Sequence, residues 1–242
     1  MNLNHKTLLF PHGEKQIAQM FNRISKKYDF LNGLLSLNQD KRWRRILVQS
    51  IPTSEGGVFV DVATGTGDVL IALAKQKKGY KKYVGVDIAS EMLDLAKEKA
   101  KRDQLNHLKF EIQSAHELKL SDQSVEALSI SFGLRNVIIK DKALKEFYRV
   151  MKPKGRVLIL DFFIPKKGLW AFLFQFYFHK VLPKIAGLFS DKSAYQYLPE
   201  SVNNFYSPRE LVDKMNNLGF HLESRKPFIF GWCQLLTFQK EK

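Results

Sequence analysis

Short apolar runs alternate with amphipathic segments along most of this chain. Val58–Ala63 and Tyr83–Asp87 are mainly apolar and rich in valine, which is typical of buried strands. Val69–Gln76 and Ser90–Arg102 have apolar residues at helical spacing, and Ser90 is a suitable N-cap. The same patterns predict three more strands and one more helix: Leu108–Ile112, Ala127–Phe132 and Val157–Phe162, with a helix over Asp141–Met151.

This alternation predicts an α/β fold with a doubly wound, mostly parallel, seven-stranded sheet, whose ligands bind outside the carboxyl ends of the strands. The C-terminal part differs, because a helix over Pro208–Leu218 is followed by two strand-like runs. Those runs, Phe220–Lys226 and Trp232–Gln239, are separated by a short loop and predict an antiparallel hairpin at one sheet edge. With 242 residues, we expect residues 1–242 to form a single domain.

Two segments lie outside this frame, and both are expected to cover the ligand crevice. Residues 1–50 predict an N-terminal helical cap, since Gln16–Phe21 has helical apolar spacing. Residues 165–205 form an aromatic insertion that is suited to shield a hydrophobic substrate. Its most apolar part, Leu169–Phe178, is too short to cross a bilayer but long enough to lie on one, or to be an ordinary buried helix.

The chain is strongly basic, with 39 Lys and Arg against 24 Asp and Glu and a formal charge of +15. Such a balance favours an anionic membrane or a nucleic acid as partner, or is simply a solvated basic surface. The one cysteine, Cys233, excludes an intramolecular disulfide, and the first residues lack the apolar region of a secretory signal. We therefore expect a cytoplasmic protein.

A glycine-containing loop, Asp61–Asp68, follows the first expected strand directly. Gly65 and Gly67 let the backbone turn tightly and approach a ligand closely. Asp87 ends the second strand, where a carboxylate can accept hydrogen bonds from both ribose hydroxyls. The spacing predicts an adenosine-type cofactor.

The loop favours S-adenosylmethionine over a dinucleotide. A dinucleotide fingerprint requires a third glycine where this chain has Leu70. Asp68 also brings a negative charge to the helix start, where a pyrophosphate would bind. S-adenosylmethionine has no phosphate and carries a sulfonium and an ammonium group, so an acidic loop suits it.

Other chemistries find no support in the sequence. No Cys or His grouping has metal-ligand spacing, and no Ser-His-Asp signature is present, so neither a metal nor a hydrolase is expected. His116 is interpreted as a loop histidine rather than a catalytic base.

Several motifs together resemble the ubiquinone/menaquinone biosynthesis C-methyltransferases, which include demethylmenaquinone methyltransferases and are a branch of the class I S-adenosylmethionine-dependent enzymes. The most specific is Ser131–Val137, with the sequence Ser-Phe-Gly-Leu-Arg-Asn-Val. The resemblance covers nearly the whole chain, and its other motifs are Lys27–Asn32, Trp43–Arg45, Ala63–Asp68, Arg149–Pro153 and Tyr195–Ser201.

The resemblance implies a set of cofactor contacts that agrees with the loop analysis. Thr66, Asp87, Ser114, Ala115 and Ser131 match the family's contacts, and the loop itself adds Asp61, Gly65 and Gly67.

The resemblance also places Arg135 and Asn136 next to the substrate ring. We interpret Arg135 as stabilising a phenolate, directly or through a water, and Asn136 as orienting its oxygen. The alternative for Arg135 is a buried arginine that ties two loops together. Candidates for lining the acceptor pocket, or alternatively for the core, are Tyr28, Asn32, Tyr195 and Tyr197.

The activity that the resemblance implies is C-methylation of a demethylated polyprenyl quinol, at the inner face of an anionic membrane. The menaquinone and ubiquinone precursors both stay open as substrates, as does a homo-oligomer. A methyltransferase acting on rRNA or tRNA is the second hypothesis, favoured by charge and opposed by the lack of a separate RNA-binding module, so no nucleic acid partner is expected. A non-enzymatic assembly or lipid-binding protein is the third.

Overall fold

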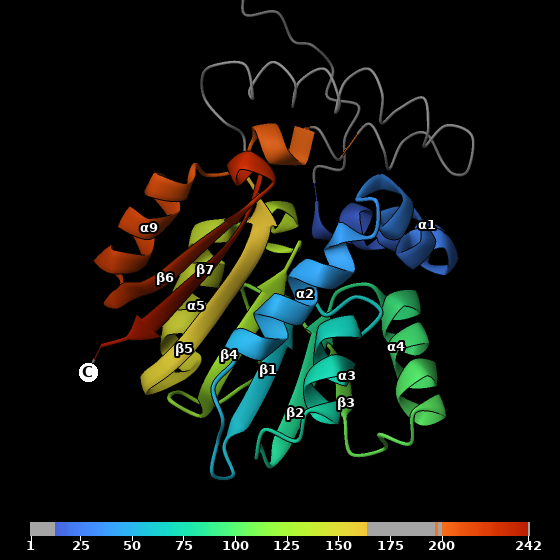
Figure 1. The fold of residues 1–242 in the computed structure, drawn as a ribbon, viewed down its shortest axis with the longest axis horizontal. Coiled ribbons are helices and arrows are strands. Elements are labelled where there is room, and N and C mark those ends of the chain that lie inside the picture. Colours follow the sequence, from blue (N-terminus) through green and yellow to red (C-terminus); the bar gives the residue numbers. More distant parts are fainter. Residues whose placement is uncertain (1–12, 164–196, 198–199, 242) are drawn as a thin grey trace, which may run out of the picture.

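A computed structural model describes residues 13–163, 197 and 200–241. A twisted seven-stranded sheet runs through it, with strand order β3-β2-β1-β4-β5-β7-β6 (Figure 1). Strands β3, β2, β1, β4 and β5 are parallel to one another, and β7 is antiparallel to both β5 and β6. The strands are β1 (Val58–Val62), β2 (Lys82–Asp87), β3 (Lys109–Ile112), β4 (Val125–Ser131), β5 (Met151–Phe162), β6 (Phe220–Phe228) and β7 (Cys233–Lys240).

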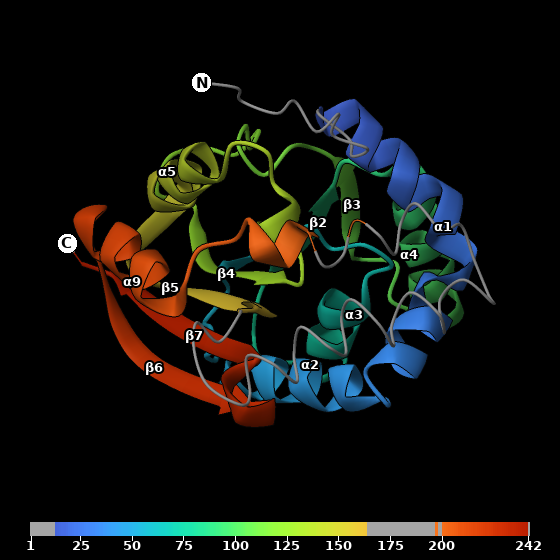
Figure 2. The same ribbon diagram turned by 90° about the horizontal axis from the view of Figure 1, so that it is seen from above.

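Helices cover both faces of the sheet, because successive side chains of each strand point to opposite faces. Phe59 of β1 packs with α2, α3 and α4, whereas its neighbour Val60 belongs to the core under α5 and α9. Seen from above, the two groups of helices lie on opposite sides of the strands (Figure 2). The helices are α1 (Glu14–Leu35), α2 (Gln39–Ser50), α3 (Asp68–Lys75), α4 (Ser90–Arg102), α5 (Lys140–Val150) and α9 (Pro208–Asn217), with 3-10 turns η1 (Leu134–Asn136) and η3 (Ile229–Gly231).

The fold class is the one that the sequence predicts, and the main differences are in element bounds. The expected strand at Val157–Phe162 begins at Met151, because Met151 pairs with Val125 before the register jumps to Arg156 opposite Ala127. The preceding helix therefore ends at Val150. The C-terminal hairpin is confirmed, with β6 at the sheet edge and β7 between β6 and β5.

The N-terminal segment is helical in its described part, where α1 and α2 follow each other closely. Residues 1–12 and most of the expected aromatic insertion, residues 164–196 and 198–199, lie outside the described residues. Within the described part of the chain, no helix is long and apolar enough to cross a membrane.

Candidate cofactor and acceptor site

A pocket opens at the carboxyl ends of the central strands. The space between its walls is about 650 Å³, which includes volume open to solvent. Its floor comes from the segments that follow β1, β2, β3 and β4, and α1 forms one wall through Ile17, Phe21 and Tyr28. This is the crevice where a doubly wound sheet is expected to bind its ligand.

The loop after β1 is held in a left-handed conformation, with φ of 55° at Gly65 and 81° at Gly67. A Cβ at Gly65 would meet no atom within 4 Å, so this glycine borders open space in the pocket wall. A Cβ at Gly67 would lie 3.0 Å from the Cβ of Ala96 on α4. Gly65 therefore leaves room for a ligand to come close to the backbone. Gly67 does not line the pocket, and its missing side chain allows α3 to pack closely against α4.

Asp87 joins the end of β2 to this loop. Its Oδ2 accepts a hydrogen bond from the Gly65 N–H at 2.8 Å, and its Oδ1 accepts one from the Ala89 N–H at 2.9 Å. Burial raises the pKa of Asp87, and these N–H groups partly offset the rise. Asp87 lines the pocket with lone pairs left over, so it can accept hydrogen bonds from ribose hydroxyls.

Asp61 lies beneath the loop rather than on the pocket wall. Its carboxylate accepts hydrogen bonds from the hydroxyls of Ser129 and of Thr64, the latter at 2.7 Å. Burial raises the pKa of Asp61 to about 6, although both hydroxyls act in the opposite direction. Asp61 therefore supports the loop from behind.

Thr66 and Ser114 are turned toward protein partners. The Thr66 hydroxyl donates to Asp29 Oδ1 at 2.7 Å, and the Ser114 hydroxyl contacts the Glu14 carboxylate and lies 2.8 Å from His116 Nδ1. Ser114 lines a shallower groove beside the pocket, while its neighbour Ala115 lines the pocket itself. His116 belongs to the turn after β3, in agreement with the expected loop histidine.

Two unpaired polar atoms belong to residues of the pocket wall. Among the described residues, Ser131 Oγ and Asn136 Oδ1 are buried without a hydrogen-bond partner. Buried polar atoms are nearly always paired, so these two positions fit a polar ligand. Together with Gly65 and Asp87, which line the same pocket, Ser131 suits an adenosyl cofactor with hydroxyl and amino groups.

Arg135 is nearly buried, with 7% of its surface exposed. Its Nη1 donates to Asp161 Oδ1 at 2.6 Å and to the Phe132 carbonyl at 2.7 Å, so it ties the segment after β4 to β5. Its Nε has no partner among the described residues. Arg135 thus performs the tying role considered as the alternative, and it does not itself line the pocket.

The acceptor candidates lie in different places. Tyr28 lines the pocket, and Asn32 lies half-buried on α1 outside the pocket wall. Tyr197 is near enough to Arg135 for its charge to act on it. Burial raises the pKa of Tyr197 to about 12, although the positive charge of Arg135 acts in the opposite direction. Tyr195 lies outside the described residues.

Several wall residues were absent from the sequence prediction: Glu14, Ile17, Phe21, Ile88, Met92 and Gln113. Ile88 and Gln113 directly follow the carboxyl ends of β2 and β3, so strand ends alone could have indicated them. The α1 residues carried no such signal, because the pattern gives a helix but not the place where it docks.

Comparison with known proteins agrees with this geometry. Residues 10–238 match the model of the ubiE/COQ5 methyltransferase family. A Geotalea daltonii protein named ubiquinone/menaquinone biosynthesis C-methyltransferase UbiE is 40% identical over 94% of this chain and 97% of its own. A Deinococcus radiodurans demethylmenaquinone methyltransferase is 40% identical over 89% of this chain and 91% of its own.

Solved structures share the fold at low identity. A Thermotoga maritima S-adenosylmethionine-dependent methyltransferase superposes with a TM-score of 0.64 at 18% identity, covering 93% of this chain and 100% of its own. The [4+2]-cyclase SpnF superposes with a TM-score of 0.69 at 14% identity, covering 94% of this chain and 96% of its own. Family match, relatives and pocket lead to one conclusion: this chain belongs to the ubiE/COQ5 methyltransferase family and is an S-adenosylmethionine-dependent C-methyltransferase.

Proposed function

We propose that this enzyme methylates a ring carbon of a demethylated polyprenyl quinol in quinone biosynthesis. The observation that carries the proposal is Asn136, whose unpaired Oδ1 belongs to the same pocket wall as Gly65 and Asp87. Acceptor and cofactor groups could therefore meet in one cavity. The names of the relatives, which refer to ubiquinone, menaquinone and demethylmenaquinone, support the same substrate class.

The chemistry requires an electron-rich ring aligned with a methyl donor. S-adenosylmethionine supplies the activated methyl group, and the quinol becomes most reactive as its phenolate, whose parent hydroxyl has a pKa of about 10 by comparison with tyrosine. Asn136 Nδ2 donates to the Phe132 carbonyl at 3.2 Å, which fixes Oδ1 as an acceptor. In the proposed complex Oδ1 accepts the hydrogen bond of a ring hydroxyl and orients it.

Arg135 supplies positive charge beside this position in the proposed mechanism. Asp161 neutralises part of that charge, so Arg135 acts on the developing phenolate through its remaining Nε donor, directly or through a water. Arginine is a poor base, so it is not the group that removes the quinol's proton. Water is the proposed acceptor of the quinol's proton. In this proposal Tyr28, which lines the pocket, and Tyr197, which is near Arg135, belong to the acceptor side.

The lipid tail of such a substrate requires access from a bilayer. The net charge of +15 supports docking at the anionic inner face of a membrane, where basic residues gain electrostatic attraction. The protein in this proposal is a cytoplasmic, peripherally bound enzyme.

The test is a transfer assay with methyl-labelled S-adenosylmethionine and three acceptors: a reduced demethylmenaquinone analogue, a reduced 2-methoxy-6-polyprenyl benzoquinol and unmodified bulk RNA. Label in a quinol supports the proposal and shows which ring is preferred. Label in RNA alone, or in no acceptor despite cofactor binding, refutes it.

The proposed roles of the two polar residues are tested by Asn136→Ala and Arg135→Lys. Both are expected to bind S-adenosylmethionine as the wild type does and to lower turnover at least tenfold, within the range seen when one polar group is removed from a catalytic site. Arg135→Ala is a harsher variant, because it leaves Asp161 buried without a counter-ion. Unchanged turnover in Asn136→Ala and Arg135→Lys refutes the roles.

A further inference from the structure

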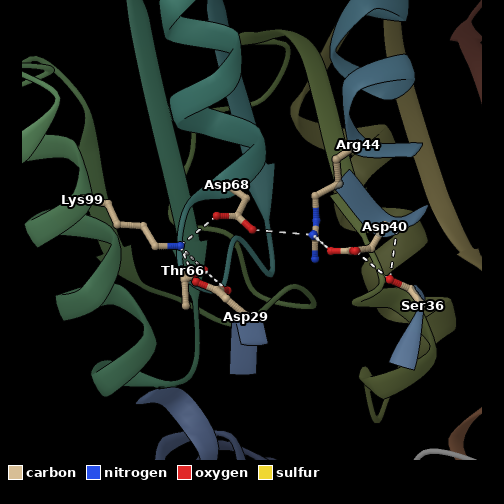
Figure 3. A network of polar contacts seen from close by, with 7 residues as sticks. All are labelled: Asp29, Ser36, Asp40, Arg44, Thr66, Asp68 and Lys99. Carbon is tan, nitrogen blue, oxygen red and sulfur yellow. Dashed lines mark hydrogen bonds and ion pairs between the residues drawn. The ribbon is translucent and has the colours of Figure 1, made fainter. Parts of the chain in front are cut away.

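A cluster of charged side chains lies directly behind the cofactor loop (Figure 3). Lys99 of α4 is at its centre, with its Nζ 2.5 Å from Asp29 Oδ2, 2.8 Å from Asp68 Oδ1 and 2.9 Å from Thr66 Oγ1. These partners belong to α1, to the start of α3 and to the loop. One ammonium group therefore joins three separate parts of the cofactor site.

Thr66 is fully engaged by this cluster. Its hydroxyl donates to Asp29 and accepts from Lys99, so its orientation is set from the protein side. Asp29 is adjacent in the chain to Tyr28, which lines the pocket. The contacts of Lys99 thus connect the loop at Gly65 to the α1 wall that faces it.

The charges explain why Lys99 matters more than an ordinary surface lysine. Three carboxylates, Asp29, Asp40 and Asp68, face two cations, Lys99 and Arg44, so the cluster carries one net negative charge. Without Lys99, Asp29 and Asp68 would face each other with no shared cation, and like charges at this spacing repel.

Arg44 completes the cluster on the side of α2. It lies 2.6 Å from Asp40 and 3.6 Å from Asp68, and although burial disfavours its charge, Asp68, Tyr28 and Asp40 raise the pKa of Arg44. Asp40 in turn accepts a hydrogen bond from the Ser36 hydroxyl at 2.6 Å. Arg44 contacts one oxygen of Asp68, whereas Lys99 contacts the other oxygen together with Asp29 and Thr66.

The α1 wall has further polar attachments. Besides Asp29, Asn22 accepts a hydrogen bond from the Glu91 N–H at 3.1 Å, and Glu14 contacts Ser114. The side chains of Lys99, Asp29 and Asp68 are 23%, 41% and 37% exposed, so water screens them in part. The three-way arrangement, rather than one pair, is what fixes the geometry.

We propose that Lys99 is a positioning residue for S-adenosylmethionine, which holds the Gly65–Asp68 loop and helix α1 in the arrangement that binds the cofactor. It touches neither cofactor nor acceptor in this proposal. The inference rests on the cofactor and not on the proposed acceptor, so a cofactor-binding measurement tests it independently of the quinol assay.

The experiment compares Lys99→Met, Lys99→Arg and the control Lys97→Met by calorimetric titration with S-adenosylmethionine. Lys97 lies on the same helix in an exposed pair with Asp94, with 55% of its side chain exposed. Lys99→Met is expected to raise the Kd about tenfold, a coupling of ordinary size. Lys99→Arg is expected to recover most of the affinity, and Lys97→Met to match the wild type.

Two further readouts separate positioning from general destabilisation. In Lys99→Met, amide exchange should accelerate in α1 and in residues 63–70 but not in β4 or β5, and KM for the cofactor should rise while kcat at saturation stays within about twofold. An unchanged Kd overturns the proposal, and so does faster exchange throughout the sheet. If Lys99→Met does not fold, the variant Asp29→Asn tests the proposal in its place. A higher Kd for S-adenosylmethionine at a wild-type melting temperature supports the proposal, and a wild-type Kd overturns it.

Discussion

Two buried hydroxyl groups lack a hydrogen-bond partner among the described residues, and their surroundings differ. Ser131 lines the pocket, whereas Thr237 lies in β7 away from it. Ser131→Ala should leave the free energy of unfolding of the cofactor-free protein within about 0.5 kcal/mol of wild type and weaken S-adenosylmethionine binding about fivefold, the value of one hydrogen bond. Denaturant titration and calorimetry measure both quantities.

Thr237→Val is the matched control for this prediction, because it also removes an unpaired hydroxyl. It is expected to keep the wild-type Kd. Equal affinities of Ser131→Ala and wild type would mean that the Ser131 hydroxyl meets no cofactor atom.

Asp61 makes stability depend on pH. Its pKa rises from an ordinary value near 3.8 to about 6 on folding, so the native protein binds the proton more tightly than the unfolded chain does. Stability from this group is therefore present at low pH and is lost as pH rises from about 4 to 6, by roughly 2 to 3 kcal/mol. The free energy of unfolding of wild type relative to Asp61→Asn should fall across this window and level off above it. A difference that is flat, or that rises with pH, would contradict the assignment.

At the scale of elements, helix α2 packs on the sheet with Trp43, Leu47 and Val48 buried, and Trp43 is the largest of these side chains. Trp43 is 2% exposed and its ring lies 5.9 to 6.2 Å from those of Phe228, Phe162 and Phe132. Trp43→Ala should lower the free energy of unfolding by about 3 to 5 kcal/mol, as other large core truncations do. Trp43→Phe should cost less than half as much. Urea denaturation followed by far-UV circular dichroism checks both, and a loss below about 1 kcal/mol in Trp43→Ala would show that α2 is held by other contacts.

Most of the sheet could be predicted because its central strands are buried on both faces and therefore read as apolar runs. The start of β5 could not, since Lys152–Gly155 contains charged residues, a proline and a glycine, and only the pairing of Met151 with Val125 extends the strand there. The order of the strands along the sheet follows from crossovers that no local pattern encodes.

The candidate site was predictable to the extent that it lies at strand ends. Gly65, Asp87, Ala115, Ser131 and Asn136 line the pocket. Asp61, Thr66 and Ser114 came from the right segments, but tertiary partners that are distant in sequence, such as Asp29 and Glu14, determine where their side chains point. Lys99 had no sequence signal, because it is one of several lysines on an amphipathic helix.

At the scale of the whole molecule, the charge of +15 predicts reversible membrane binding. The protein should sediment with vesicles that contain anionic phospholipid at low ionic strength, and be released by about 0.5 M salt, where the screening length falls well below 10 Å. Vesicles of zwitterionic lipid are the control and should bind little protein. Strong binding to zwitterionic vesicles that salt does not reverse would indicate an apolar contact instead of the electrostatic one.

The position of β7 between β5 and β6 also has a consequence for protein synthesis. On the ribosome, β5 gains its partner β4 early, but its other edge, Arg156–Phe162, stays unpaired until Cys233–Lys240 has been made. At about 5 to 20 residues per second this interval lasts several seconds. Two stalled nascent chains test this: one that ends before Cys233, and one that extends past Lys240 by a linker. The first should be cut by protease near β5 more readily than the second. An open strand edge is a template for pairing with other chains, so this enzyme is most exposed to misassembly, and most in need of a chaperone, just before its last strand emerges.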